Sequence, residues 1–361
     1  MDKEKNKIIT IIPIMVVVII LGAYFFGWDI ATYFNKDKKV VGISELAVKI
    51  TEQIEAGDED GVFYVTGVTE KEIININDYI CCPSGIVSQY SILETSHKGM
   101  KVMFTYDISD NYYVLRKYLY GEGIPSDRTI AHKLYDKVVV IIDEIITDDM
   151  TDYEKELAIH DYIVENCEYG YTDYEREYAY RAYGVLVQGK AVCNGYAEAM
   201  ALLLSCAGIE NSIVTGEAGG ELHAWNIVNL DGEWYQVDAT WNDPLPDRGN
   251  FVGHTYFNVT DDVLDDTHVW NDEMTEDCNG TRYNYYQYND LVGGFDDFSN
   301  QVRLKASRDI TGTVEMLVND YSADVYVYQF IFTIPGVISF QYNEQPCGDD
   351  YVITIFLNNT Q

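Results

Sequence analysis

Residues 188–204, QGKAVCNGYAEAMALLL, form a polar, glycine-containing turn that runs into a helix, with Cys193 at the junction. Apolar residues recur at helical spacing as far as Leu204, and Gly208 marks the end of the helix. A cysteine at a helix start lies beside free backbone N–H groups and the positive end of the helix dipole, which favour the nucleophilic thiolate. The alternative is a small residue buried under the helix, because free cysteine is among the most buried residue types.

Two strand-like runs, residues 222–230 and 233–241, flank the dipeptide Asp231-Gly232. Asp-Gly between such runs is a strong signal for a β-hairpin. With a two-residue turn, the pairing makes His223 and Asp238 diagonal neighbours on one face of the sheet, where an imidazole can meet a carboxylate. A longer turn would shift the register and weaken this inference.

The order Cys193, His223, Asp238 fits a nucleophile, a base and an orienting carboxylate. Cys193 would attack a carbonyl, His223 would hold the thiolate as an ion pair and protonate the leaving amine, and Asp238 would fix the imidazole tautomer. The backbone N–H of Cys193 is the natural oxyanion donor, and Gln188 is a candidate second donor, although a turn glutamine can simply be solvated. Taken singly, His223 could be a structural strand residue and Asp238 the cap of a turn. Together they favour a catalytic site.

Residues about 150–245 resemble the transglutaminase-like superfamily, a branch of the papain-like folds found in many bacterial surface proteins. The blocks that carry the resemblance are 150–155 (MTDYEK), 158–161 (AIHD), 189–197 (GKAVCNGYA), 208–209 (GI), 223–226 (HAWN), 232–235 (GEWY), 237–241 (VDATW) and 266–270 (DTHVW).

The resemblance implies an α+β, papain-like core in which a cysteine-bearing helix packs on an antiparallel sheet. It carries over Cys193, His223 and Asp238 as a catalytic triad. Trp225 and Trp241 are then expected to line the site rather than to take part in the reaction.

The domain organisation expected from the whole chain has five parts. They are a cytoplasmic stub and transmembrane signal anchor (1–28), a linker and short helix (29–60), a small accessory α/β unit (61–145), the catalytic core (146–275) and a second accessory α/β unit (281–361) that loosely echoes the first.

An apolar run from Ile8 to Phe26 follows Lys3, Lys5 and Lys7. Its length of roughly 28 Å as a helix is close to the thickness of a bilayer core. No small-x-small cleavage pattern follows, which favours an uncleaved anchor over a removed signal peptide. We therefore expect a single-pass protein of the cell membrane with its N-terminus inside and its catalytic region extracytoplasmic.

The 361 residues carry a formal net charge of −35, and 47% of them are hydrophobic. Such an acidic chain lacks the basic patches that nucleic-acid binding requires, so we expect no nucleic-acid partner.

The seven cysteines have no regular spacing, and the vicinal pair Cys81-Cys82 leaves a disulfide with Cys278 or Cys347 open. The sequence has no CxxC or HExxH pattern and no apparent calcium-binding loop. Accordingly, we expect neither a metal nor another cofactor.

The expected function is that of a membrane-anchored cysteine enzyme acting on amide bonds of protein or peptide substrates. Water as the second nucleophile gives a peptidase, and a lysine amine gives cross-linking of Gln to Lys side chains; the same triad serves both. His160 and His268 are not expected to be catalytic. One alternative is a non-catalytic scaffold or binding protein at the cell surface. A deglycosidase of the same superfamily would require paired zinc cysteines, which the sequence lacks.

Overall fold

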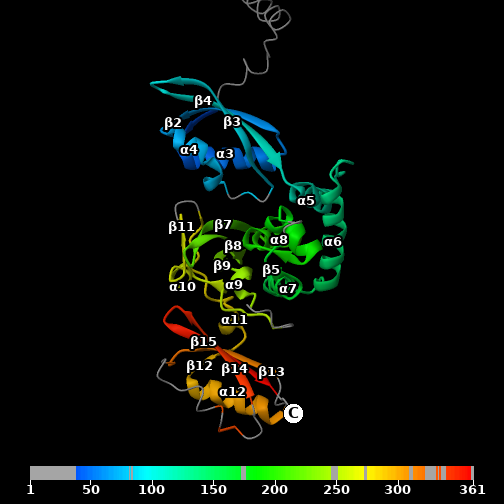
Figure 1. Cartoon of the computed structure of the whole chain (residues 1–361), viewed down its shortest axis with the longest axis vertical. Coiled ribbons are helices and arrows are strands. Elements are labelled where there is room, and N and C mark those ends of the chain that lie inside the picture. Colours follow the sequence, from blue (N-terminus) through cyan, green and yellow to red (C-terminus); the bar gives the residue numbers. More distant parts are fainter. Residues whose placement is uncertain are drawn as a thin grey trace, which may run out of the picture.

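Three units follow one another along the long axis of the molecule, each built on its own β-sheet (Figure 1). The computed structural model describes residues 38–80, 82, 84–171, 176–244, 251–271, 275–308, 312–321, 331, 333–334 and 339–358. Within these residues no helix is long and apolar enough to cross a bilayer, and the expected anchor at 8–26 lies outside them.

The N-terminal unit is a four-stranded sheet in the order β1-β2-β4-β3. Its elements are β1 (Lys38–Val41), α3 (Ile43–Glu55), β2 (Asp60–Thr66), α4 (Glu70–Ile74), η1 (Ile76–Tyr79), β3 (Gly85–Ser96) and β4 (Gly99–Ile108). Buried residues alternate with more exposed ones along β2 and β4, so one sheet face supplies the core. Helix α3 packs in that core, so the part of the expected linker 29–60 that forms α3 belongs to this unit.

The central unit is a five-stranded sheet in the order β10-β9-β8-β7-β11, in which all neighbours are antiparallel. The strands are β7 (Asn211–Ala218), β8 (Glu221–Leu230), β9 (Glu233–Val237), β10 (Phe257–Val259) and β11 (His268–Trp270). The longer helices are α5 (Asp110–Tyr120), α6 (Thr129–Ile145), α7 (Asp152–Asn166) and α8 (Cys193–Cys206). The shorter elements are β5 (Glu168–Tyr169), η2 (Tyr178–Tyr180), the π-helix η3 (Gly184–Gln188), β6 (Lys190–Ala191), α9 (Ala239–Asn242) and α10 (Asp261–Leu264).

Helix α8 lies at the centre of this unit, because 11 of its 14 residues are buried. A helix that is buried on all sides is a core element rather than a surface one. Helices α5 and α6 share its hydrophobic cluster through residues such as Val114 and Val138. They therefore pack on the central unit, although their residues fall within the expected accessory unit 61–145. The expected α+β core, a cysteine-bearing helix on an antiparallel sheet, is confirmed.

The β8–β9 hairpin has the register that its turn predicts, from Leu230 opposite Glu233 to Asn226 opposite Val237. Asp231 and Gly232 both have positive φ, as the tight turn requires. The returning strand is shorter than the predicted run 233–241, because Asp238 ends it and caps helix α9.

The C-terminal unit is again a four-stranded sheet, in the order β12-β13-β15-β14. Its elements are α11 (Tyr285–Tyr288), β12 (Val292–Gly293), α12 (Phe295–Arg308), β13 (Gly312–Val318), β14 (Ser339–Cys347) and β15 (Asp350–Asn358). Both flanking units have a parallel strand pair joined through a helix and then an antiparallel hairpin. They therefore share one topology.

Candidate active site

Cys193 is the first residue of α8 and is half-buried. A Cβ added at Gly195 would meet the Ala179 carbonyl oxygen at 2.5 Å and the Ala191 side chain at 2.9 Å. Glycine at this position therefore allows the helix start to pack closely against the preceding chain. The backbone N–H of Cys193 belongs to the first turn, where N–H groups have no partner within the helix.

His223 lies on β8, and its side chain connects the cysteine to a carboxylate. Its Nε2 lies 2.8 Å from Oδ2 of Asp238, and Cys193 is near enough to act on the imidazole, which leaves Nδ1 as the nitrogen on the cysteine side. Burial acts to lower the pKa of His223, but the hydrogen bonds to Asp238 and Cys193 and the charges of both raise it to about 10. The imidazolium form is thus favoured at neutral pH.

Asp238 is completely buried, and its carboxylate accepts four hydrogen bonds. Oδ1 accepts from the backbone N–H groups of Thr240 and Trp241 at 2.9 and 3.1 Å. Oδ2 accepts from Nε2 of His223 at 2.8 Å and lies 3.1 Å from Nε2 of His268. Burial would raise the pKa of Asp238, but the two imidazoles outweigh it and lower the pKa to about 2. The carboxylate stays ionised and is fixed in orientation.

His268 is the residue at this site that the sequence interpretation missed. It lies on β11, is fully buried, and has Nδ1 2.8 Å from the Thr267 hydroxyl. Strand β11 pairs with β7, on the side of the sheet away from β9. The DTHVW block, residues 266–270, was the available signal, but nothing local in the sequence indicates its contact with Asp238.

The three weaker candidates have different positions. Trp241 lines the cleft beside His223 and packs against His268 with ring centroids 4.7 Å apart. Trp225 is only 1% exposed, stacks against His223, and donates its indole N–H to Gln236 at 2.7 Å. It therefore supports the imidazole from within the core. Gln188 ends η3 and is not among the residues that line the cleft.

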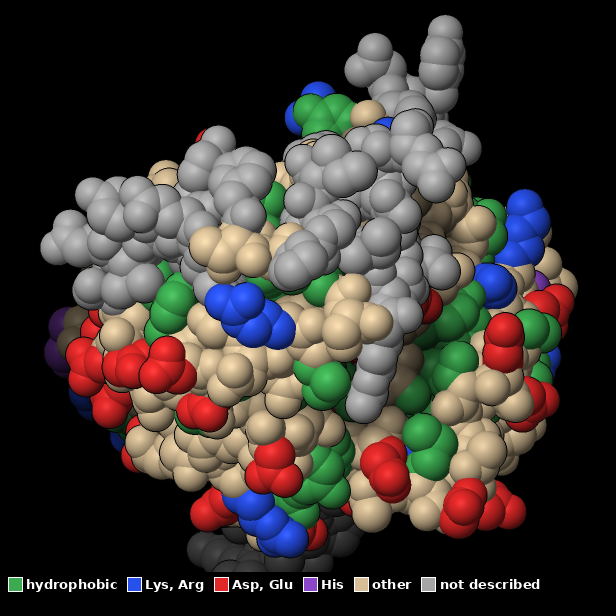
Figure 2. All heavy atoms as spheres, turned by 90° about the horizontal axis from the view of Figure 1, so that it is seen from below, with side chains coloured by type: hydrophobic (Ala, Val, Ile, Leu, Met, Phe, Trp, Pro, Cys, Tyr) green, Lys and Arg blue, Asp and Glu red, His purple; other side chains and the backbone are tan. Residues whose placement is uncertain are grey.

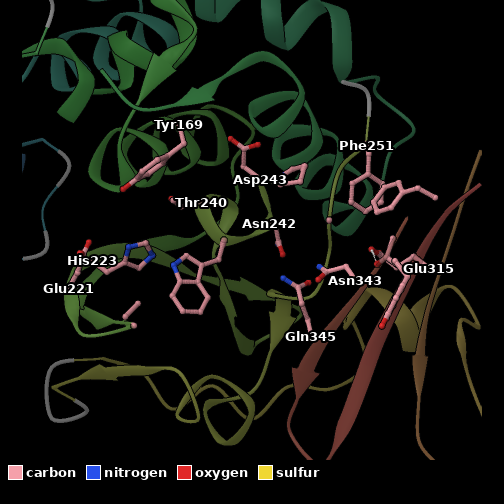
Figure 3. Close-up of a pocket in the computed structure, with 18 of the residues that line it drawn as sticks. Tyr169, Glu221, His223, Thr240, Asn242, Asp243, Phe251, Glu315, Asn343 and Gln345 are labelled. Carbon is pink, nitrogen blue, oxygen red and sulfur yellow. Dashed lines mark hydrogen bonds between the residues drawn. The ribbon is translucent and has the colours of Figure 1, made fainter. Parts of the chain in front are cut away.

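A cleft of about 560 Å³ opens beside His223 (Figure 3). Core residues from β5 to the chain after α9 form part of its lining, and strands of the C-terminal unit form the rest. The lining residues are Tyr169, Ala218, Gly219, Glu221, Leu222, His223, Thr240, Trp241, Asn242, Asp243, Pro244, Phe251, Gly253, Glu315, Tyr342, Asn343, Gln345, Thr354 and Phe356. None of them is Lys or Arg. Acidic side chains are scattered over the face seen from the C-terminal end, among hydrophobic and basic ones (Figure 2).

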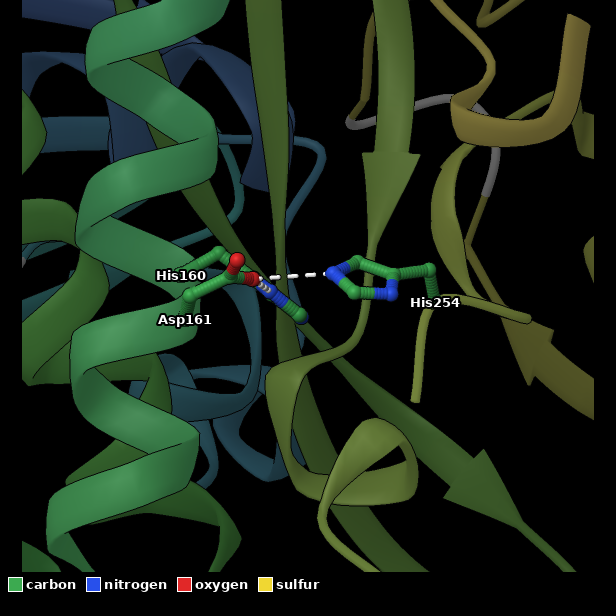
Figure 4. A group of neighbouring side chains, drawn as sticks. All are labelled: His160, Asp161 and His254. Carbon is green, nitrogen blue, oxygen red and sulfur yellow. Dashed lines mark hydrogen bonds and ion pairs between the residues drawn. The ribbon is translucent and has the colours of Figure 1, made fainter. Parts of the chain in front are cut away.

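Two groups of described side chains offer three ligand atoms within 4.8 Å of one another, as a metal site would. One is His223, Asp238 and His268, whose atoms are engaged in the contacts above. The second is His160, Asp161 and His254, in which Oδ1 of Asp161 lies 2.9 Å from a nitrogen of each imidazole (Figure 4).

The hydrogen bonds of the second group determine the tautomer of His160. Asn242 accepts the N–H of Tyr256 with Oδ1 at 2.9 Å, so its Nδ2 faces Nε2 of His160 at 3.0 Å and donates to it. Neutral His160 therefore carries its proton on Nδ1 and donates it to Asp161. Burial lowers the pKa of His160, which favours this neutral form. A metal would need that nitrogen unprotonated, so the group fits a hydrogen-bonded network rather than a metal site.

Five other cysteines lie in the described part of the chain. Burial raises the pKa of Cys82, Cys167, Cys206 and Cys347 to about 12, and it also raises the pKa of Cys278. All are free thiols, so the disulfides left open between Cys82 and Cys278 or Cys347 are not formed. Cys81 lies outside the described residues.

The family model described as the transglutaminase-like superfamily matches residues 141–239. Kyphoscoliosis peptidase of Homo sapiens is 31% identical over 145 residues, and that of Mus musculus is 28% identical over 142 residues. In both cases the match covers 34% of this chain and 22% of the relative. The chain thus spans about a fifth of the length of these curated relatives.

Solved structures show weaker similarity. One described as a TGase has a TM-score of 0.27 and 16% identity, covering 50% of this chain and 51% of that one. The periplasmic domain of TgpA from Pseudomonas aeruginosa, bound to ethylmercury, has a TM-score of 0.25 and 14% identity, covering 45% and 69%.

Proposed function

Residues 141–239 belong to the transglutaminase-like superfamily, and from this premise we propose that the protein is a cysteine enzyme that performs acyl transfer at amide bonds with Cys193, His223 and Asp238. The observation that supports the proposal best is the position of His223. Its imidazole contacts a fully buried, ionised carboxylate on one side and the thiol at the start of α8 on the other. A merely structural histidine needs no such pair of partners.

The reaction follows from these contacts. The Cys193 thiolate forms a bond to the carbonyl carbon of the substrate amide, and the negative oxygen is stabilised by the backbone N–H of Cys193. The C–N bond then breaks as His223 gives its proton to the leaving amine, which leaves a thioester on the cysteine. A second nucleophile transfers a proton to His223 and bonds to the thioester carbon, after which the C–S bond breaks and returns the Cys193 thiolate. Water yields a carboxylic acid, and a lysine amine yields a new amide cross-link.

Location is also part of the proposal. We infer from the basic residues and the apolar run at 8–26 that the protein is anchored in the cell membrane with its catalytic region extracytoplasmic. Accessibility of the catalytic region to a protease added to intact cells tests this placement. Protection of the whole chain until the cells are lysed would contradict it.

The chemistry is tested by labelling the full-length protein with iodoacetamide between pH 6 and 9 and reading each cysteine by peptide mass spectrometry. Cys193 should label fastest at pH 6–7, and His223→Ala should remove that advantage. His97→Ala is the control, because His97 is exposed in the β3–β4 turn. If Cys193 labels no faster than the buried cysteines, or if His223→Ala has no effect, the scaffold alternative replaces the enzyme.

Hydrolysis and cross-linking are distinguished in a second assay. A glutamine-containing protein is incubated with the enzyme and a fluorescent primary amine, and both amine incorporation and new peptide termini are measured. Incorporation identifies a transglutaminase, and cleavage identifies a peptidase. The Cys193→Ala variant should produce neither.

A further inference from the structure

We propose that the C-terminal unit forms part of the substrate site and selects extended polypeptide segments. This inference rests on the proposed function. It assigns to the hairpin β14–β15 the second wall of the cleft beside His223, so that residues more than 100 positions after the candidate triad determine which amides reach Cys193.

The cleft is composite. Tyr169, Trp241 and His223 come from the central unit, while Asn343 of β14 and Phe356 of β15 come from the C-terminal one. Figure 3 shows the β14 side chains across the cavity from the His223 side. At about 560 Å³ the space is within the range of pockets that hold whole ligands, and it is larger than a single glutamine or lysine side chain needs.

The second wall is held in place by contacts across the junction of the two units. Thr255, only 1% exposed, donates its hydroxyl to Oε1 of Gln345 at 2.6 Å. The rings of Phe251 and Phe356 meet edge-to-face with centroids 4.8 Å apart. These two contacts connect the central unit to the hairpin that lines the other side of the cleft.

A second contact across the junction involves His254. The His254 ring stacks on Tyr285 of the C-terminal unit with centroids 3.7 Å apart and an interplanar angle of 6°. Its Nε2 contacts Asp161 of α7 at 2.9 Å, and its Nδ1 lies 3.8 Å from Oε1 of Glu315 on β13. The His160–Asp161–His254 network therefore joins the core helix to the strand that lines the cleft.

The chemistry of the second wall suits a polypeptide. Asn343 of β14 is exposed, and it lies opposite Thr354, so it shares a sheet face with the half-buried Phe356 of β15, which lines the same cleft. An aromatic ring beside a carboxamide can cover an apolar side chain and hydrogen-bond a peptide group at the same time. An aromatic side chain in a concave site is typical of ligand binding.

The experiment compares two electrophiles on Cys193 of the full-length protein. Iodoacetamide reports the reactivity of the thiol alone, because it is too small to reach the second wall. An acetylated tetrapeptide chloromethyl ketone, in which the sulfur displaces chloride, must also occupy the cleft. Second-order labelling rates are read by peptide mass spectrometry for the wild type, Phe356→Ala and Asn343→Ala. The matched controls are Tyr120→Ala on α5 and Asn319→Ala after β13, both exposed and outside the cleft.

We expect the two cleft variants to label with the tetrapeptide about tenfold more slowly, with iodoacetamide rates changed by less than about twofold. The controls should change neither rate. An unchanged tetrapeptide rate in both cleft variants would overturn the role of the C-terminal unit while leaving the proposed enzyme intact. Failure of iodoacetamide to label Cys193 preferentially would instead overturn the enzyme, and this inference with it.

Discussion

Replacing Asp238 by asparagine should disable Cys193 while leaving the fold of the hairpin in place. The amide oxygen can still accept the N–H groups of Thr240 and Trp241, as Oδ1 does now. The amide nitrogen then replaces Oδ2. In the wild type Oδ2 accepts hydrogen bonds from the Nε2 atoms of His223 and His268, whereas the amide nitrogen presents N–H donors to them. His223 must therefore place its proton on Nδ1, toward the cysteine, and it loses the charge that stabilises its imidazolium.

The magnitude follows from the pKa of His223. A pKa of about 10, against an ordinary value of 6.5, corresponds to roughly 5 kcal/mol in favour of the imidazolium. Cys193 accounts for part of this effect. Removing the Asp238 carboxylate should therefore reduce the free energy that favours the imidazolium by about 3 kcal/mol, which corresponds to roughly hundredfold slower labelling of Cys193. His223 of the wild type stays protonated until the pH approaches 10, whereas in the variant only Cys193 still opposes the effect of burial, so His223 loses its proton at a lower pH.

The assay is the iodoacetamide rate of Cys193 between pH 6 and 9 for the wild type, Asp238→Asn and Asp231→Asn. The last is a matched control, because Asp231 is exposed in the hairpin turn and pairs with Arg282 on the surface. Thermal unfolding of each variant shows whether the fold survives. A folded Asp238→Asn protein that labels at the wild-type rate at pH 6–7 would refute the role given to the carboxylate.

Three further results are expected. His268→Ala should slow Cys193 labelling by about three- to tenfold and shift its pH profile, and His268→Gln should restore part of the rate because its amide can still donate to Asp238. Glu156 is completely buried, and burial raises its pKa to about 8. The folded protein therefore binds the proton more tightly than the unfolded chain, and stability should fall as the pH rises from about 4.5 through 8. Melting temperatures across this range should show the fall, and Glu156→Gln should abolish most of it; a parallel fall in the variant would exclude Glu156 as the cause. Glu221, Asp243 and Glu315 line a cleft without Lys or Arg, so a tetrapeptide probe with lysine should label faster than one with glutamate. Glu221→Gln should reduce that ratio by up to about fivefold, and a ratio that favours the acidic probe would contradict the charge argument.

The hairpin was predictable because its determinants are local. Asp231 and Gly232 fix both the turn and the register, so the positions of His223 and Asp238 follow from residues within a short segment. The length of the returning strand was not predictable from alternation, because residues 238–241 suit a strand by composition. The side chain of Asp238 caps the next turn and ends the strand instead.

The rest of the site depends on distant pairing. His268 reaches Asp238 only because β11 joins the sheet beside β7, 30 residues beyond the carboxylate. Likewise, strand alternation places Trp225 on the same face as His223, but it does not reveal that α10 and the residues around Cys278 bury that tryptophan. Asn343 belongs to the cleft through the junction of two units, for which the sequence carries no periodic signal.

Asp238 shows why a structural and a catalytic interpretation of one residue need not compete. Its Oδ1 caps α9, which ends β9 and holds the carboxylate at a fixed place in the fold. Because Oδ1 is occupied by two backbone N–H groups, Oδ2 is the oxygen left to face the imidazoles of His223 and His268. The cap thus determines which oxygen reaches the histidine and from which direction. A side chain that capped the helix less firmly would also hold His223 less firmly, so the local fold and the proposed chemistry depend on the same four hydrogen bonds.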